Sequence, residues 1–124
     1  MLLLSVVTTP WPTLPNADLA QVSEAKLRDY VLHPAHPQGG PKARVFAAVL
    51  GITRTDWQYL RRQLLTGVRT APAQLRATTQ WGALYDVAID VTGPAGRMHR
   101  VRTGWIIRAG EDQPQLLTAY VDLP

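Results

Sequence analysis

The chain has 124 residues, and it contains no cysteine and only three histidines. The lack of cysteine excludes disulfide bonds and thiolate zinc sites, and it leaves the redox compartment open. No two histidines have the spacing of a zinc-binding helix, so we predict no metal and no cofactor. Because the sequence also lacks a nucleophile elbow, a phosphate-binding loop and a dinucleotide fingerprint, it belongs to none of the most easily recognised enzyme classes.

Long apolar runs are absent as well. The segment Met1 to Thr9 is mostly apolar, but it is too short to cross a bilayer, and neither a basic segment before it nor a small-residue cleavage site after it marks a signal peptide. We therefore expect no membrane association and a cytoplasmic location. We interpret residues 1–15 as an N-terminal extension or edge strand that ends in a proline-rich linker, and residues 16–124 as one domain.

The charge is unevenly distributed. Residues 1–72 contain eight basic and four acidic side chains, whereas residues 73–124 contain five of each, so the whole net charge of +4 lies in the first part. Eleven of the thirteen basic residues are arginine, which binds phosphate in a bidentate manner. This composition favours a polyanion such as RNA as partner, although frequent arginine can also reflect genome composition.

Helical periodicity dominates the chain up to residue 67. Apolar stripes and capping residues predict a helix from Ser23 to about Leu32, a second from Pro41 to about Leu50, and a third from Thr53 to Gly67. In detail, we predict Ser23, Gly40 and Thr53 as N-caps, Asp56 as the capping-box partner of Thr53, and Gly51 and Gly67 as C-terminal caps.

After residue 73 the period changes from about 3.6 to 2. Alternating apolar residues predict two long strands joined by the turn Gly93–Gly96, with Gly96 in the left-handed conformation. This turn pairs Tyr85 with Trp105, Val87 with Thr103, Ile89 with Val101 and Asp90 with Arg100. Shorter strands are predicted at Leu75–Gln80 and Gln115–Val121. The fold class is therefore α+β, with three N-terminal helices packed on a roughly four-stranded antiparallel β-meander.

The loop between the first two helices is the first candidate for chemistry. It contains His33 and His36, three prolines and two glycines, and it leads into Lys42 in the first turn of the second helix. Unpaired backbone N–H groups, the helix dipole and an ammonium would together suit a phosphate, and a neutral imidazole nearby could transfer protons. An ordinary proline-rich connection with surface histidines would show the same pattern.

The polar face of the sheet carries further candidates. Asp90 is expected to neutralise Arg100 across the strands, whereas Arg102 faces Ala88 and has no direct carboxylate partner, which makes it the better phosphate ligand. Asp86 is expected to pair with an arginine. Thr118 and Tyr120 share one face of the last strand, although β-propensity alone would also explain them.

Several motifs resemble a small bacterial family of unknown function. They are Lys26–Leu32, His36–Ala43, Gly51–Trp57, Gly93–Gly96, Val101–Ile107 and Leu117–Tyr120, and the resemblance extends over roughly Leu14 to Val121. The layout of this family is similar to ribonuclease toxin domains of the barnase/EndoU/colicin/RelE superfamily. In one respect the sequence departs from the pattern, because Val121-Asp122 follows Tyr120 where proline is expected.

The resemblance implies a metal-independent ribonuclease in which the ribose 2′-OH attacks the adjacent phosphate. It implies His36 as general acid or base, Lys42 as phosphate anchor, Arg102 as stabiliser of the developing charge and Thr118 in the wall of the site. His33 and His99 are the candidates for a second histidine. We add as substrate-binding residues Gly39, Gly40, Arg54, Arg100 and Tyr120.

Two other functions remain open. The domain could be a non-catalytic binding module, such as an antitoxin or immunity-like partner. A DNA-binding or regulatory role ranks lower, because no helix-turn-helix pattern is present. A ribonuclease toxin would have RNA as substrate and a cognate antitoxin or immunity protein as partner, and the sequence leaves the oligomeric state open.

Overall fold

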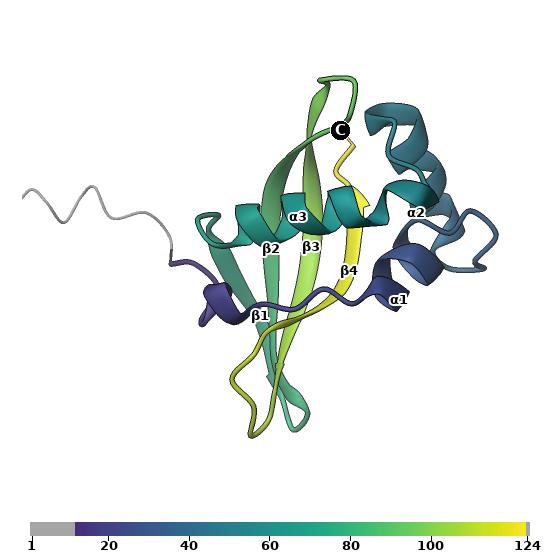
Figure 1. The fold of residues 1–124 in the computed structure, drawn as a ribbon. Helices are drawn as coiled ribbons and strands as arrows, with labels where there is room; N and C mark the ends of the chain where they lie inside the picture. The colour runs from purple at the N-terminus through teal and green to yellow at the C-terminus, as the bar shows by residue number, and fades with distance from the viewer. Residues whose placement is uncertain (1–11, 124) are drawn as a thin grey trace, which may run out of the picture.

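A computed structural model describes residues 12–123 of the chain. A single 3-10 turn (Ala17–Leu19) and three longer helical segments precede four antiparallel strands that follow the order β1-β2-β3-β4, which confirms the predicted α+β class. The strands are β1 (Ala73–Thr79), β2 (Gly82–Thr92), β3 (Met98–Arg108) and β4 (Gln115–Val121). Figure 1 shows α3 crossing one face of the sheet, with α1 and α2 beside β4.

Each helical segment is a short α-helix with a wider or tighter turn attached. They are α1 (Glu24–Lys26) with a π-type turn at Leu27–Val31, α2 (Gly40–Val45) with a π-type turn at Phe46–Leu50, and α3 (Trp57–Val68) after a 3-10 turn at Arg54–Asp56. Two predicted N-caps are confirmed, because the Ser23 side chain accepts from Lys26 N and Thr53 forms a capping box with Asp56. Gly51 ends the second segment in the left-handed conformation, as predicted.

Two glycines have roles that differ from the prediction. The N-cap of α2 is Gly39 rather than Gly40, so this helix begins one residue early. Gly67 is not a cap, since α3 continues to Val68. A Cβ on Gly67 would lie 2.3 Å from Ile89 Cγ2, so glycine is needed here for close packing of helix on sheet and not for a left-handed turn.

The long hairpin has the predicted register throughout. Gly93 N donates to Arg97 O at 2.7 Å, and Gly96 has a φ of 91°. The predicted pairs Tyr85–Trp105, Val87–Thr103, Ile89–Val101 and Asp90–Arg100 are all present. A single-residue slip would have turned the apolar set of each strand to the wrong face, so the hydrophobic pattern and the turn define the same alignment.

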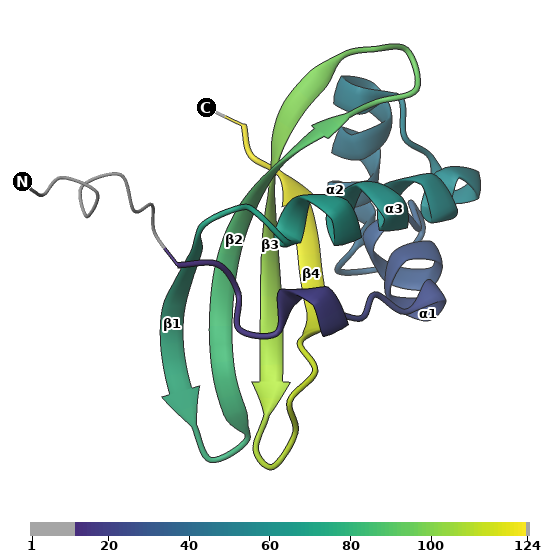
Figure 2. The same ribbon diagram turned by 60° about the vertical axis from the view of Figure 1, so that its left-hand side comes forward.

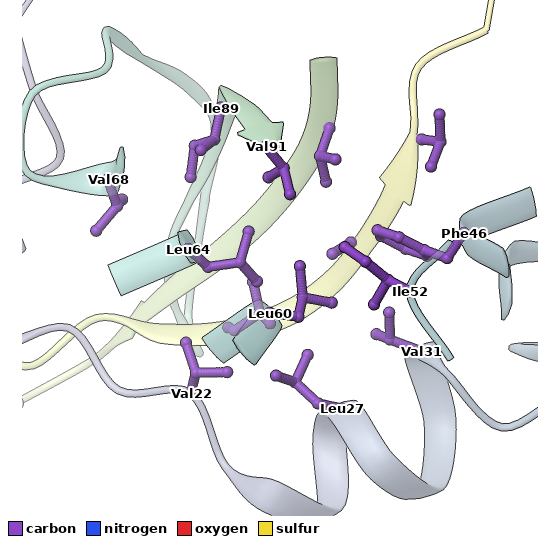
Figure 3. Close-up of a cluster of buried hydrophobic side chains, with 14 of the residues drawn as sticks. Val22, Leu27, Val31, Phe46, Ile52, Leu60, Leu64, Val68, Ile89 and Val91 are labelled. Carbon is purple, nitrogen blue, oxygen red and sulfur yellow. The ribbon is translucent and has the colours of Figure 1, made fainter. Parts of the chain in front are cut away.

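The core lies between the helical segments and the face of the sheet that α3 crosses. Its largest members, Trp105 and Phe46, are completely buried. Figure 3 shows Leu60 and Leu64 of α3 among side chains from every layer, including Leu27, Phe46 and Ile89. Thr103 is a buried polar residue, and its hydroxyl donates to Val87 O and accepts from Trp105 Nε1, each at 2.7 Å.

The segment before α1 crosses the sheet from the side of β1 towards α1 (Figure 2). Thr13 forms an antiparallel bridge with Pro72, and Leu14 is only 1% exposed. The predicted extension or edge strand at residues 1–15 falls largely on residues 1–11, which lie outside the described part of the chain.

Within residues 12–123, no helix is both long and apolar enough to cross a bilayer. In the same part of the chain, no three His, Asp or Glu side chains gather closely enough to hold a metal ion.

Candidate functional site

The face of the sheet opposite the helices, which we call the open face, contains a groove. The groove consists of two hollows that share Asp86 and Arg102, with volumes of about 310 and 610 Å³. The smaller hollow lies over β3 and β4, and it is lined by Arg76, Asp86, Arg102, Thr103, Gly104, Thr118 and Tyr120. The larger hollow continues past Arg100 to the start of β1, where Gly67 of α3 and the turn at Thr70 and Ala71 also line it. Gly104 leaves room for the Thr118 side chain, because a Cβ there would lie 3.3 Å from Thr118 Cγ2.

Lys42 reaches this groove from α2. Its ammonium Nζ donates to Thr118 Oγ1 at 2.9 Å and to Tyr30 Oη at 3.0 Å. The same Nζ lies 5.7 Å from the centre of the Tyr120 ring. Two hydrogen bonds and a cation–π contact therefore hold the lysine charge at the β4 side of the smaller hollow.

Tyr30 is the centre of the group of side chains around Lys42. The ammonium groups of Lys26 and Lys42 each lie 5.1 Å from its ring centre, and the His36 ring packs edge-on with the two centroids 5.0 Å apart. The hydrogen bond from Lys42 lowers the pKa of the Tyr30 phenol; the Thr118 hydroxyl and the charge of Lys26 act in the same direction, and partial burial opposes them.

His36 is held by the loop that it belongs to. Its ring Nδ1 accepts from the backbone N–H groups of Gln38 and Gly39, both at 3.0 Å. These contacts need the lone pair of Nδ1, so the neutral tautomer that fits them has its proton on Nε2. Gly40 N donates to His36 O at 2.8 Å. His36 thus accepts from three N–H groups at and just before the start of α2, which leaves fewer of them open to a phosphate than the prediction supposes.

The open-face charges are paired differently from the prediction. Arg102 does face Ala88, but its Nε donates to Asp122 Oδ2 at 3.1 Å, so the expectation that it lacks a carboxylate partner is wrong. Pairing residues across neighbouring strands does not predict this partner, because Asp122 follows the end of β4. Asp86 pairs with Arg76 at 3.2 Å, as expected of a carboxylate among arginines. Asp90 and Arg100 are directly opposite in the sheet without forming an ion pair.

The structure brings most of the predicted catalytic residues together. Arg102, Thr118 and Tyr120 line the smaller hollow, and Lys42 bonds to Thr118. His36 joins this group through its contact with the Tyr30 ring. We call the set Tyr30, His36, Lys42, Arg102 and Thr118 the Lys42 cluster.

Several predicted substrate-binding residues have other surroundings. Arg100 lines the larger hollow. Gly39 and Gly40 permit tight chain crossings, since a Cβ on them would lie 2.0 Å from Tyr30 O and 2.6 Å from Pro34 O. Arg54 lies away from the groove, where it bonds to Arg28 O and to Asp29 Oδ1, each at 2.9 Å.

Neither His33 nor His99 lines the groove. His33 borders a separate hollow with Arg54, and the His99 ring lies next to its neighbour's carbonyl, Arg100 O, at 3.2 Å.

Sequence reasoning did not select Tyr30 or Asp122. Tyr30 fits the apolar stripe of the first helix together with Leu27 and Val31, so nothing in the pattern marks its hydroxyl as part of a site. The available signal was its spacing from Lys26, four residues before it, which places the two side chains on one helix face. The signal for Asp122 was the departure from the expected proline after the last strand.

The fold and site define a small α+β domain with helices on one face of an antiparallel meander and a cation-lined groove on the other. Residues 13–123 match the family described as a domain of unknown function, DUF6883, and the chain belongs to this family. No curated protein matches it.

A similar solved structure is a chain of a contact-dependent growth inhibition toxin–immunity protein complex from Klebsiella pneumoniae 342. The TM-score is 0.64 at 10% sequence identity, over 87% of this chain and 97% of that chain. At this identity, the comparison shows a shared fold.

Proposed function

We propose that this domain is a metal-independent endoribonuclease of toxin type, which acts on RNA in the cytoplasm. The observation that carries the proposal is the fixed ammonium of Lys42, which Thr118 and Tyr30 hold at the edge of an open groove lined by Arg76 and Arg102. A phosphate in the smaller hollow would meet Lys42 on one side and Arg102 on the other. Both cations would gain strength as negative charge develops on the phosphorus oxygens during attack of the ribose 2′-OH.

The groove is also suited to a chain of nucleotides. The larger hollow adds Arg100, Asp90 and Gln74 next to the phosphate-sized hollow. Arg100 could contact a neighbouring phosphate, while Asp90 and Gln74 offer hydrogen-bond partners for sugar or base. Thr118 and Tyr120 form the opposite end of the groove, so RNA would cross the open face from β4 towards β1.

His36 has a narrower role here than the sequence suggests. With the Nδ1 lone pair engaged, the ring donates from Nε2 and is poorly suited to accept a proton there. We assign it the Nε2–H hydrogen bond to the charge that develops on the departing 5′ oxygen. A neutral histidine of this kind stabilises a transition state without being charged itself.

The similar fold adds a biological context. The Klebsiella structure is described as a toxin–immunity protein complex, and we propose that this chain likewise has a cognate inhibitory protein that covers the groove. A non-catalytic partner with the same fold is the alternative. The ion pairs Arg76–Asp86 and Arg102–Asp122 favour this alternative, because they neutralise two cations of the groove.

The test is cleavage of a mixed-sequence RNA by purified protein in excess chelator. Wild type should cleave, and Lys42→Ala should cleave much more slowly. Arg61→Ala should cleave normally, because Arg61 is an exposed cation of α3 outside the groove. RNA affinity should fall linearly with the logarithm of salt concentration, with a slope of about −2 if three phosphates are contacted. If wild type does not cleave, or only with divalent metal, the enzymatic proposal is wrong. If RNA is neither cleaved nor bound in a salt-dependent manner, the protein-partner alternative is favoured.

A further inference from the structure

The Tyr30 hydroxyl is a partly buried partner of Lys42, and the proposed function gives it no chemical role beyond holding the ammonium. It accepts a hydrogen bond from Lys42 Nζ at 3.0 Å, and the same Nζ bonds to Thr118 Oγ1, which lines the smaller hollow. Tyr30 Oη is therefore next to the atoms that would hold a phosphate. Its ring is fixed by the edge-on contact with His36 and by the tight crossing at Gly39.

The surroundings of this phenol favour its anionic form. Lys26 of α1 and Lys42 of α2 both lie over the ring, and β4 contributes the neutral Thr118 hydroxyl and the Tyr120 ring next to Lys42. The nearby acidic residues Glu24 and Asp29 point elsewhere, since they pair with Arg28 and Arg54. The hydrogen bond from Lys42 is the largest influence, and it lowers the pKa of Tyr30 below its ordinary value.

The reaction needs a group that removes the 2′-OH proton, and His36 is poorly suited to it because its Nε2 carries a proton while Nδ1 accepts two N–H groups. We propose that Tyr30 is a catalytic residue, the general base that takes the 2′-OH proton from the RNA substrate. This inference rests on the proposed ribonuclease function, and it extends that function by naming the base and its pairing with Lys42.

The step balances without a metal or cofactor. The phenolate of Tyr30 takes the proton of the 2′-OH, the 2′ oxygen forms a bond to phosphorus, and the bond from phosphorus to the 5′ oxygen breaks. The 5′ oxygen leaves with the electron pair, is stabilised by the His36 Nε2–H and takes a proton from water. The products are a 2′,3′-cyclic phosphate and a 5′-hydroxyl, and Tyr30 then returns its proton to solvent.

The test is the pH dependence of cleavage by wild type, Tyr30→Phe and Lys42→Met. In wild type, the rate should rise with pH up to the pKa of Tyr30 and then level off. Tyr30→Phe should bind RNA normally, because Lys42 is intact, but cleave roughly 10²–10⁴-fold more slowly without this rising limb. Lys42→Met, which removes the charge next to the phenol, should shift the rising limb of its residual activity to higher pH.

A second measurement does not depend on activity. The chain contains four tyrosines, and each gains phenolate absorbance as the pH rises. Subtracting the titration curve of Tyr30→Phe from that of wild type leaves the curve of Tyr30 alone. The pKa of Tyr30 measured in this way should lie below the ordinary value of a tyrosine in wild type and shift upward in Lys42→Met. A thermal melt shows whether Tyr30→Phe is folded; if it is not, the Lys42→Met shift decides.

The two possible failures are distinguishable. If wild type does not cleave RNA, the proposed function fails and the catalytic role of Tyr30 fails with it. If wild type cleaves and Tyr30→Phe cleaves at the same rate with the same pH profile, only the assignment of Tyr30 is wrong. A folded Tyr30→Phe that is slow at every pH by the same factor, with its rising limb intact, would make Tyr30 a support for Lys42 and not the base.

Discussion

Lys42 Nζ lies 2.9 Å from Thr118 Oγ1, although 76 residues separate the two in sequence. The contact joins the second helical segment to the last strand, and it places a charge from the helical layer at the open face of the sheet. Because β4 borders on α1 and α2, a side chain of lysine length can pass around its edge. The predicted catalytic loop and the predicted catalytic strand thus meet at one ammonium.

We expect substitutions of the two loop residues to separate binding from turnover. Lys42→Ala should weaken RNA binding and cleavage together, because its charge acts on the bound phosphate and on the transition state. His36→Asn should lower the rate by roughly 10²–10³-fold with little loss of affinity, since it removes a neutral donor. Asparagine keeps an acceptor for the loop N–H groups, which His36→Ala would remove. Steady-state cleavage and filter binding measure the two effects, and equal losses of affinity in both variants would contradict the assignment.

Asp122 should weaken the binding of RNA to the groove. Its carboxylate accepts from Arg102 Nε at 3.1 Å and neutralises part of the positive charge there. We expect Asp122→Asn to strengthen RNA binding up to about fivefold, which corresponds to the small free energy of an exposed ion pair. Asp112→Asn in the turn before β4 is the matched control, because it makes the same change of charge outside the groove. If both variants gain affinity equally, only net charge matters.

Gly67→Ala should destabilise the domain by about 1–3 kcal/mol, although alanine ordinarily favours a helix. The added Cβ would lie 2.3 Å from Ile89 Cγ2, and α3 would have to move off the sheet. Thr66→Ala, one residue earlier and exposed, provides the control with almost no expected loss. Urea unfolding of both variants measures the difference, and a more stable Gly67→Ala would show that the helix can shift without cost.

The pH dependence of stability should contain a small acid component from Asp29. Hydrogen bonds from Arg28 and then Arg54 lower the pKa of Asp29 from 3.8 to about 2. Because the pKa is lower in the folded state, the stabilisation is complete above pH 3.8 and is lost as the pH falls through about 2. Asp29→Asn should therefore melt slightly below wild type at pH 7, and the two melting temperatures should converge near pH 2. A constant difference across this range would exclude the linkage.

The sequence predicts the sheet better than the site, for a physical reason. Strand register depends on a local turn and on a period of 2, and both are visible between Tyr85 and Trp105. Helix caps such as Ser23 and Thr53 depend on groups three residues apart, so they are equally visible. The exact end of α3 is not, because Gly67 fits a helix terminus as well as it fits a crossing over Ile89, and only the packed structure distinguishes them.

The site depends on contacts across the fold. A pattern of residue types places Lys42, Arg102 and Thr118 on their elements, but it does not give the reach of Lys42 around β4. It also misses Tyr30, because its ring fits the apolar stripe of the first helix, whereas its hydroxyl accepts a hydrogen bond from Lys42 next to the groove. Arg54 is the opposite case, since its charge suggests RNA binding while a hydrogen bond to Asp29 holds its side chain away from the groove.

The order of the strands also bears on how the domain forms. Every neighbour in the sheet is a neighbour in the chain, so each pairing closes only a short turn before its hydrogen bonds and apolar contacts are gained. The β2–β3 hairpin can therefore assemble first and offer its apolar face to the helices. The groove is complete only when Lys42 bonds to Thr118, so the site depends on a contact between residues 76 positions apart in the chain and not on the local hairpins.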